Sequence, residues 1–240
     1  GVPFRKIMEH KIIRAKTQLP VRDLIEIPGV GYVTLEPFGP QTHNANVKAM
    51  SQPHAHPESY QPVTFRPATN DESIATASYM FGDEETFKLK ETVFNPNWLL
   101  AGRIVRTQDG VWTNPTGQFN ELAMKKLLVP DRKVNGIYLL NGNTAFVPYG
   151  FKTEAQSHEE FLQGGLARAI KHTSKLKAEK LEAIANNKVY PNGVFVWGFD
   201  EVSELTERVL SLYSGRYLDD GRLLVDGYGW LDNYDGYAFG

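Results

Sequence analysis

The chain has 240 residues, of which 41% are hydrophobic and 22% charged, and its formal net charge is −2. This composition is typical of one globular domain over residues 1–240, and the charge gives no bulk attraction to nucleic acid or to an anionic membrane. The absence of cysteine excludes disulfides, cysteine-ligated zinc, iron–sulfur clusters and thiol catalysis. No apolar run approaches the roughly 20 residues that span a bilayer, so we expect a soluble protein, with the cytoplasm favoured.

A turn sequence, Pro28-Gly29-Val30-Gly31, lies between two short segments of alternating polarity. Together with Leu24 and Ile27 it resembles the hairpin of the helix-hairpin-helix family, a resemblance that implies DNA binding. Bulky Leu35 and helix-breaking Pro37 depart from that family's second helix. Alternating polarity on both sides of a tight Pro-Gly turn favours a β-hairpin, which is the interpretation we adopt.

The next segment, residues 37–70, is rich in proline. Nine of the fourteen prolines and four of the six histidines precede Ala68. Little apolar periodicity survives here, which predicts a long extended arm that wraps on the core or on a partner. We therefore expect self-association or contact with an unidentified partner protein.

Within this arm, His54, His56 and Glu58 form a His-x-His-x-Glu pattern. In an extended backbone, residues two apart project to one face, so two imidazoles and a carboxylate would converge. Such a set suits a transition metal and leaves open positions for water, which a catalytic site needs. The alternative interpretation is a solvated Pro/His loop without a cofactor.

The middle of the chain predicts two further hairpins. Residues 71–94 suggest two strands around a turn at 82–85, because apolar residues alternate before the turn. Residues 99–105 and 111–113 flank Asp109-Gly110, a strong hairpin signal. An amphipathic helix is then expected over residues 119–128, ending before Pro130.

The clearest signals lie in residues 134–187. Two apolar runs, 137–140 and 144–147, flank Asn141-Gly142-Asn143 and predict a hairpin. Ser157, followed three residues later by Glu160, predicts a capped helix start. Glycines inside the helical pattern and a loss of phase near 173–174 suggest a bend or a second helix.

One face of this helix carries Arg168, Lys171 and Lys175 at three- and four-residue spacing. These cations could bind phosphate groups or a nucleic acid backbone. Glutamates nearby dilute the charge, so a solvated helix face is the competing interpretation.

The C-terminal part predicts a strand at 194–197, a helix at 202–213 and a strand at 222–225, an order that allows a parallel pair. Together these patterns predict an α+β fold: a mixed, mainly antiparallel sheet built from hairpins, with two or three packed helices and a long N-terminal extended arm.

After the last strand, Tyr228, Trp230 and Tyr234 alternate with Asp, Asn and Gly. Aromatic rings among small polar residues can form a stacking platform for sugars or bases. Inward packing at a sheet edge explains the same composition and is the interpretation we favour, since Tyr and Trp bury well when their polar atoms find partners.

Standard catalytic motifs are absent from the sequence: there is no Gly-Lys-Ser/Thr phosphate loop, no Gly-x-Ser-x-Gly elbow and no His-Glu-x-x-His. Our leading hypothesis is therefore a non-catalytic interaction or assembly protein. A metal-dependent enzyme that uses the His-x-His-x-Glu pattern is the first alternative, and a phosphate or nucleic-acid binder that uses the basic helix is the second. No membrane association is expected, and nucleic acid is disfavoured by the net charge.

Overall fold

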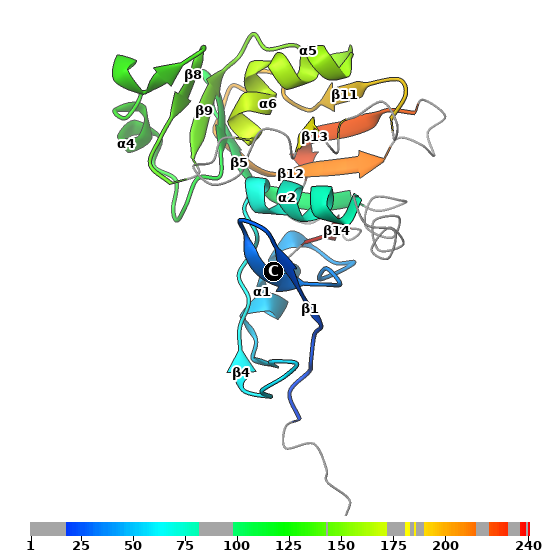
Figure 1. The fold of residues 1–240 in the computed structure, drawn as a ribbon. Helices are drawn as coiled ribbons and strands as arrows, with labels where there is room; N and C mark the ends of the chain where they lie inside the picture. Colours follow the sequence, from blue (N-terminus) through cyan, green and yellow to red (C-terminus); the bar gives the residue numbers. More distant parts are fainter. Residues whose placement is uncertain are drawn as a thin grey trace, which may run out of the picture.

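The computed structural model describes residues 18–81, 98–142, 144–171, 181–182, 185, 190–214, 221–229, 236–238 and 240. It confirms the α+β class, with helices packed on a mixed, mostly antiparallel sheet (Figure 1). The described α-helices are α1 (His43–Ser51), α2 (Asn70–Phe81), α4 (Glu121–Lys125), α5 (His158–Gln163) and α6 (Gly165–Ile170). In this described part of the chain, no helix has the length and apolar character required to cross a bilayer.

The strands are short apart from three central ones. They are β1 (Leu24–Ile27), β2 (Gly31–Thr34), β3 (His54–Ala55), β4 (Pro62–Val63), β5 (Trp98–Arg106), β6 (Gly110–Thr113), β7 (Lys133–Val134), β8 (Ile137–Leu139), β9 (Ala145–Pro148), β10 (Glu154–Gln156), β11 (Val194–Trp197), β12 (Thr206–Ser214), β13 (Leu223–Gly229) and β14 (Gly236–Tyr237). A 3-10 helix, η1 (Pro130–Arg132), precedes β7.

The main sheet has the strand order β10-β11-β13-β12-β5-β6-β9-β8-β7, and β14 pairs with β5 outside this path. Neighbouring strands are antiparallel except for the pairs β11 with β13 and β14 with β5. The parallel pair that the sequence order allowed is therefore present, with β12 lying on the far side of β13.

Three predicted hairpins are confirmed, namely β1 with β2, β5 with β6 and β8 with β9. In the first, Ile27 faces Gly31 across the turn. Gly29 and Gly31 both have positive φ there, which glycine adopts without steric cost. The β-hairpin interpretation therefore holds, and the helix-hairpin-helix resemblance does not extend to the structure.

The main core lies between one face of the sheet and the helices α2, α5 and α6 (Figure 1). Ile104, Val111 and Val147 supply apolar side chains from three adjacent strands on that face. The opposite face carries a smaller cluster around Trp112, which the segment containing Phe119 and α4 covers. Both faces of the central strands are thus buried.

The predicted helix start at Ser157 is confirmed. Its hydroxyl accepts a hydrogen bond from the Glu160 amide at 3.1 Å, and the Glu160 carboxylate accepts one from the Ser157 amide at 2.9 Å. The helix breaks at Gly164, and α6 starts at Gly165, where a Cβ atom would lie 3.0 Å from Val147 Cγ2. The small residue lets α6 approach β9 closely, and the break comes earlier than the predicted bend, which lies outside the described residues.

The predicted strand before residue 82 is wrong, because this segment forms α2. Thr69 and Glu72 make a reciprocal capping box, with hydrogen bonds of 3.3 Å and 2.9 Å between side chains and amides. Helical spacing then buries Ile74 and Ala77 in the main core. The turn and second strand predicted for residues 82–94 lie outside the described residues.

The predicted helix at 202–213 is also wrong, because residues Thr206–Ser214 form β12. This strand lies between β5 and β13, so both its edges are hydrogen-bonded. A register shift at Leu210 and Ser211 breaks the polar–apolar alternation that would have marked a strand in the sequence.

The expectation of an extended arm over residues 37–70 is only partly met. The nine-residue helix α1 interrupts it, and the Thr42 side chain caps that helix by accepting a hydrogen bond from the Ala45 amide at 3.1 Å. Phe38 and Met50 are fully buried against Val209 of β12. This segment therefore packs on the sheet through specific apolar contacts.

Candidate functional sites

His54 lies at the start of β3 and is 5% exposed. Its Nδ1 lies 2.8 Å from the carbonyl oxygen of Gln52, to which it can donate a hydrogen bond. Its ring makes edge contacts with Phe38 and Phe65, at centroid distances of 5.7 Å and 5.2 Å. These contacts give the imidazole a packing role in the small aromatic cluster under the sheet.

His56 and Glu58 follow in a different geometry. The extended backbone ends at Ala55, and the chain turns over residues 57–59. His56 Nδ1 accepts hydrogen bonds from the amides of Glu58 and Ser59, at 3.2 Å and 3.3 Å, so it caps this turn. No group of three or more metal-ligating side chains is found among the described residues. The metal site stays a prediction that these contacts do not support.

Two of the three cations of the predicted basic helix face, Arg168 and Lys171, are described by the structure. Arg168 Nε donates to the Gly164 carbonyl at 3.4 Å, and Lys171 Nζ donates to the Leu162 carbonyl at 3.3 Å. Burial, and to a smaller degree the charge of Arg168, lowers the pKa of Lys171. Lys175 lies outside the described residues. Both described cations thus turn toward backbone carbonyls of their own helical region.

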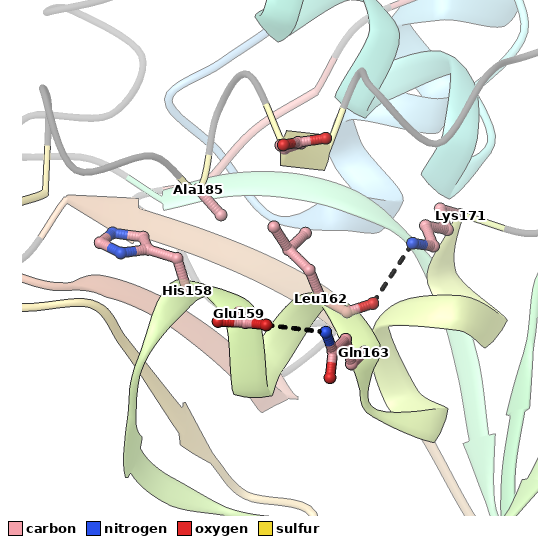
Figure 2. A pocket seen from close by; sticks show the side chains of 7 residues that line it. His158, Glu159, Leu162, Gln163, Lys171 and Ala185 are labelled. Atoms are coloured by element: carbon pink, nitrogen blue, oxygen red, sulfur yellow. Dashed lines mark hydrogen bonds between the residues drawn. The ribbon is translucent and has the colours of Figure 1, made fainter.

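Lys171 also lines a pocket of about 450 Å³ (Figure 2). The described lining residues come from α5, the end of α6 and the segment around residue 185, and they are His158, Glu159, Leu162, Gln163, Lys171, Glu182 and Ala185. The side-chain amide of Gln163 donates to Glu159 at 3.1 Å. His158 Nε2 is buried without a hydrogen-bond partner. The pocket therefore combines a cation, two carboxylates and an unsatisfied imidazole nitrogen.

Of the predicted aromatic platform, only Tyr228 is described, because Trp230 and Tyr234 lie outside the described residues. The Tyr228 side chain is 38% exposed, and the guanidinium carbon of Arg106 lies 5.0 Å from its ring centroid. Trp197 at the end of β11 is 58% exposed. Sequence reasoning assigned Trp197 only to a strand and missed its exposure.

Arg106 is buried beneath this region and binds the loop that follows β11. It is 2% exposed and donates from Nη1 to the carbonyl of Gly198 and from Nη2 to the carbonyl of Asp200, the latter at 3.1 Å. Gly198 has positive φ, and a Cβ there would lie 2.6 Å from the Tyr228 ring. The loop after β11 is thereby held against β13.

Asp226 lies beside this arrangement, and its Oδ1 accepts a hydrogen bond from the Tyr228 amide at 2.7 Å. Burial raises the pKa of Asp226 to about 6, against the opposing effects of that hydrogen bond and of the charge of Arg106. The carboxyl is therefore a group that gains or loses its proton under mildly acidic conditions.

The loop and strand ends around Arg106 form a surface that we call the β11–β13 surface. Its exposed apolar side chains are Trp197, Leu205 and Tyr228, and its exposed carboxylates are Asp200, Glu201 and Glu204. None of these carboxylates makes an ion pair with another described residue. The surface is consequently aromatic and negatively charged.

A second apolar surface, which we call the α4 surface, lies over α4, η1 and β7. Its exposed side chains are Leu122 (77%), Leu127 (37%), Val129 (41%) and Val134 (47%). A pocket of about 210 Å³ adjoins them, with Phe119, Met124, Leu127, Arg132 and Leu140 among its lining residues. The apolar stripe of an amphipathic helix normally packs inward, whereas Leu122 points to solvent.

Comparison of the chain with models of protein families, with curated proteins and with solved structures found no match. Function is therefore inferred from these surfaces and pockets alone.

Proposed function

We propose that this chain is a non-catalytic interaction protein and that the α4 surface binds its partner. The observation that supports this is the concentration of exposed apolar side chains. Of the eleven large hydrophobic side chains exposed in the described part of the chain, four lie within residues 122–134. Single exposed leucines are common on protein surfaces, but a group of exposed apolar side chains beside a pocket is typical of an interaction site.

The charges around the α4 surface indicate the chemistry of the partner. Lys125 is already paired with Asp109 and Glu121, at 2.6 Å and 2.9 Å. Lys126, Arg132 and Lys133 remain without a carboxylate partner among the described residues. One exposed carboxylate, Asp131, opposes these three cations. We propose a partner segment that combines acidic residues with an apolar anchor.

Peptide selection tests this proposal. Random peptides selected against the immobilised full chain should be enriched in Asp or Glu together with Leu, Phe or Trp. Their affinity, measured by fluorescence anisotropy, should fall about tenfold or more in Leu122→Ser. Tyr32→Ser is the matched control, since Tyr32 is 69% exposed on β2, which pairs with β1 in a two-stranded sheet separate from the main sheet. Peptides that bind Leu122→Ser as tightly as the original chain would exclude the α4 surface.

The pocket beside Lys171 supports a second candidate function, the binding of a small ligand. Its volume of about 450 Å³ lies within the range of ligand pockets, and His158 Nε2 has no partner there. Lys171 could bind an anionic group, while Glu159 and Glu182 could bind a cationic one. The ligand class proposed is thus a small zwitterion, such as an amino acid or a short peptide.

Calorimetric titration with a set of free amino acids and dipeptides tests this second function. Binding should weaken about tenfold in Lys171→Met, because the variant keeps the side-chain length but removes the charge. Lys126→Met is the control, because Lys126 is exposed on the α4 surface and does not line this pocket. Absence of binding by every compound, or equal binding by both variants, would exclude this assignment.

A further inference from the structure

We infer that the partner of the α4 surface is the β11–β13 surface of a second copy of this chain, so that the protein associates head to tail. This inference rests on the function proposed above and adds the identity of the partner. The acidic and apolar segment required by the α4 surface is present in the same molecule. Its members are Trp197, Leu205 and Tyr228, rimmed by Asp200, Glu201 and Glu204.

The two surfaces are complementary in charge. Lys126, Arg132 and Lys133 surround the first, and three carboxylates that lack ion-pair partners among the described residues surround the second. Opposite charges at the rim of an interface steer association and fix its orientation. Two α4 surfaces placed face to face would bring like charges together, which disfavours a symmetric contact at that site.

The apolar parts supply an exposed anchor and a pocket that can receive it. Trp197 is 58% exposed and projects from the end of β11, whereas the α4 surface contains a pocket lined by Phe119, Met124 and Leu140. Tryptophan side chains that fill an apolar pocket at the partner surface commonly dominate the binding energy of an interface. We assign Trp197 as the anchor and this pocket as its receptor.

The position of the surfaces in the fold determines the kind of assembly. Along the strand order, β5, β6, β9 and β8 lie between β7 and β12, and β12 is the strand that the acidic loop enters. Arg106 holds the acidic loop through two carbonyls, so that the loop is fixed to its own end of the sheet. A contact between two different surfaces is heterologous, and repetition of it gives a ring or an open filament.

The test is complementation between two variants of the full chain. Leu122→Ser impairs the α4 surface, and Trp197→Ser impairs the β11–β13 surface. Sedimentation velocity up to about 100 µM should show concentration-dependent oligomers for the original chain and only monomers for each variant alone. An equimolar mixture of the two variants should give a dimer and nothing larger, because each keeps one intact surface. Circular dichroism and the thermal midpoint establish that each variant is folded.

A charge exchange gives a second test that does not alter apolar residues. Glu204→Lys should weaken association about tenfold, and addition of the Lys126→Glu chain should restore a mixed oligomer. Raising the salt concentration from about 0.05 to 0.5 M should weaken association of the original chain about tenfold, since exposed charges are screened.

Three outcomes overturn the inference. One is an original chain that stays monomeric over the whole concentration range. Another is association that Leu122→Ser abolishes and Trp197→Ser does not, which would place two α4 surfaces against each other. The last is folded variants that fail to complement. In each case, acidic peptides that still bind the α4 surface would preserve the proposed function, whereas loss of that binding as well would remove both.

Discussion

Arg106 is the residue on which the β11–β13 surface depends. Its buried guanidinium satisfies the carbonyls of Gly198 and Asp200. Arg106→Met would keep the apolar stem and leave both oxygens without a donor, so we expect the free energy of unfolding to fall by about 2–4 kcal/mol. Urea denaturation measures this loss. Arg132→Met, at a half-exposed position without an ion-pair partner among the described residues, should change stability by no more than about 0.5 kcal/mol. Equal effects of the two substitutions would contradict the role assigned to Arg106.

Asp226 makes a pH-dependent contribution to stability. Burial raises its pKa from the ordinary 3.8 to about 6 in the folded chain. The folded state therefore binds more protons than the unfolded state between about pH 4 and pH 6, and stability falls as the pH rises through that window. Asp226→Asn stays neutral, so its stability relative to the original chain should increase from pH 4 to pH 7. Urea denaturation at several pH values tests this, with exposed Asp131→Asn as the control. Parallel pH profiles for the original chain and Asp226→Asn would refute it.

At the scale of single elements, the contribution of a helix cap to the free energy of unfolding can be tested. The Ser157 hydroxyl and the Glu160 carboxylate satisfy two amides at the start of α5. Ser157→Ala removes one acceptor, so we expect a loss of about 1 kcal/mol in the free energy of unfolding. Ser203→Ala, in the exposed loop before β12, is the comparison and should have little effect. A thermal midpoint for Ser157→Ala that matches the original chain would show that the cap contributes nothing.

The same elements show what could be predicted from the sequence. Hairpins with short turns and the Ser157 cap were predictable, because their signals lie within a few residues. The cap formed by Thr69 and Glu72 is an equally local signal, yet the alternation of Ala75, Ala77 and Tyr79 led to the prediction of a strand. Strand β12 was beyond local reasoning, since its state depends on pairing with β5 and β13, which lie far from it in the sequence.

The candidate sites also divide into features with a local sequence signal and features that depend on contacts between distant segments. The aromatic character near Tyr228 was visible in the sequence, but Arg106 contacts Gly198, Asp200 and Tyr228 only because the fold brings three strand ends together. The α4 surface was missed although its helix had a local sequence signal. An amphipathic pattern predicts which residues can pack, and Leu122 remains exposed because α4 is short and covers only a small cluster.

At the scale of the whole molecule, an apolar cluster and backbone hydrogen bonds join the N-terminal segment to the sheet and to the C-terminal residues. Phe38 is fully buried among Met50, Val209 and Ala238. Its backbone exchanges hydrogen bonds with Ala238, at 2.8 Å and 2.9 Å, and the Thr34 amide donates to the Gly240 carbonyl at 3.0 Å. The segment around α1 thus contacts both β12 and the C-terminal residues of the chain.

These contacts predict that residues 37–70 unfold together with the sheet. Phe38→Ala would leave a cavity beside Val209 and remove ring contacts to His54 and Phe65, which should cost about 3–5 kcal/mol. If the segment and the sheet form one cooperative unit, far-ultraviolet circular dichroism and tryptophan fluorescence should report a single transition, shifted to lower urea.

Tyr60→Ala is the control in the same segment, because Tyr60 is 52% exposed and its loss should be nearly neutral. An early transition of small amplitude, followed by an unshifted main one, would mean that the segment is an independent unit. Deleting residues 41–61 should then spare the sheet. If the segment and the sheet form one cooperative unit, the same deletion should unfold the sheet, because it removes Met50, which lies in the same apolar cluster as Phe38.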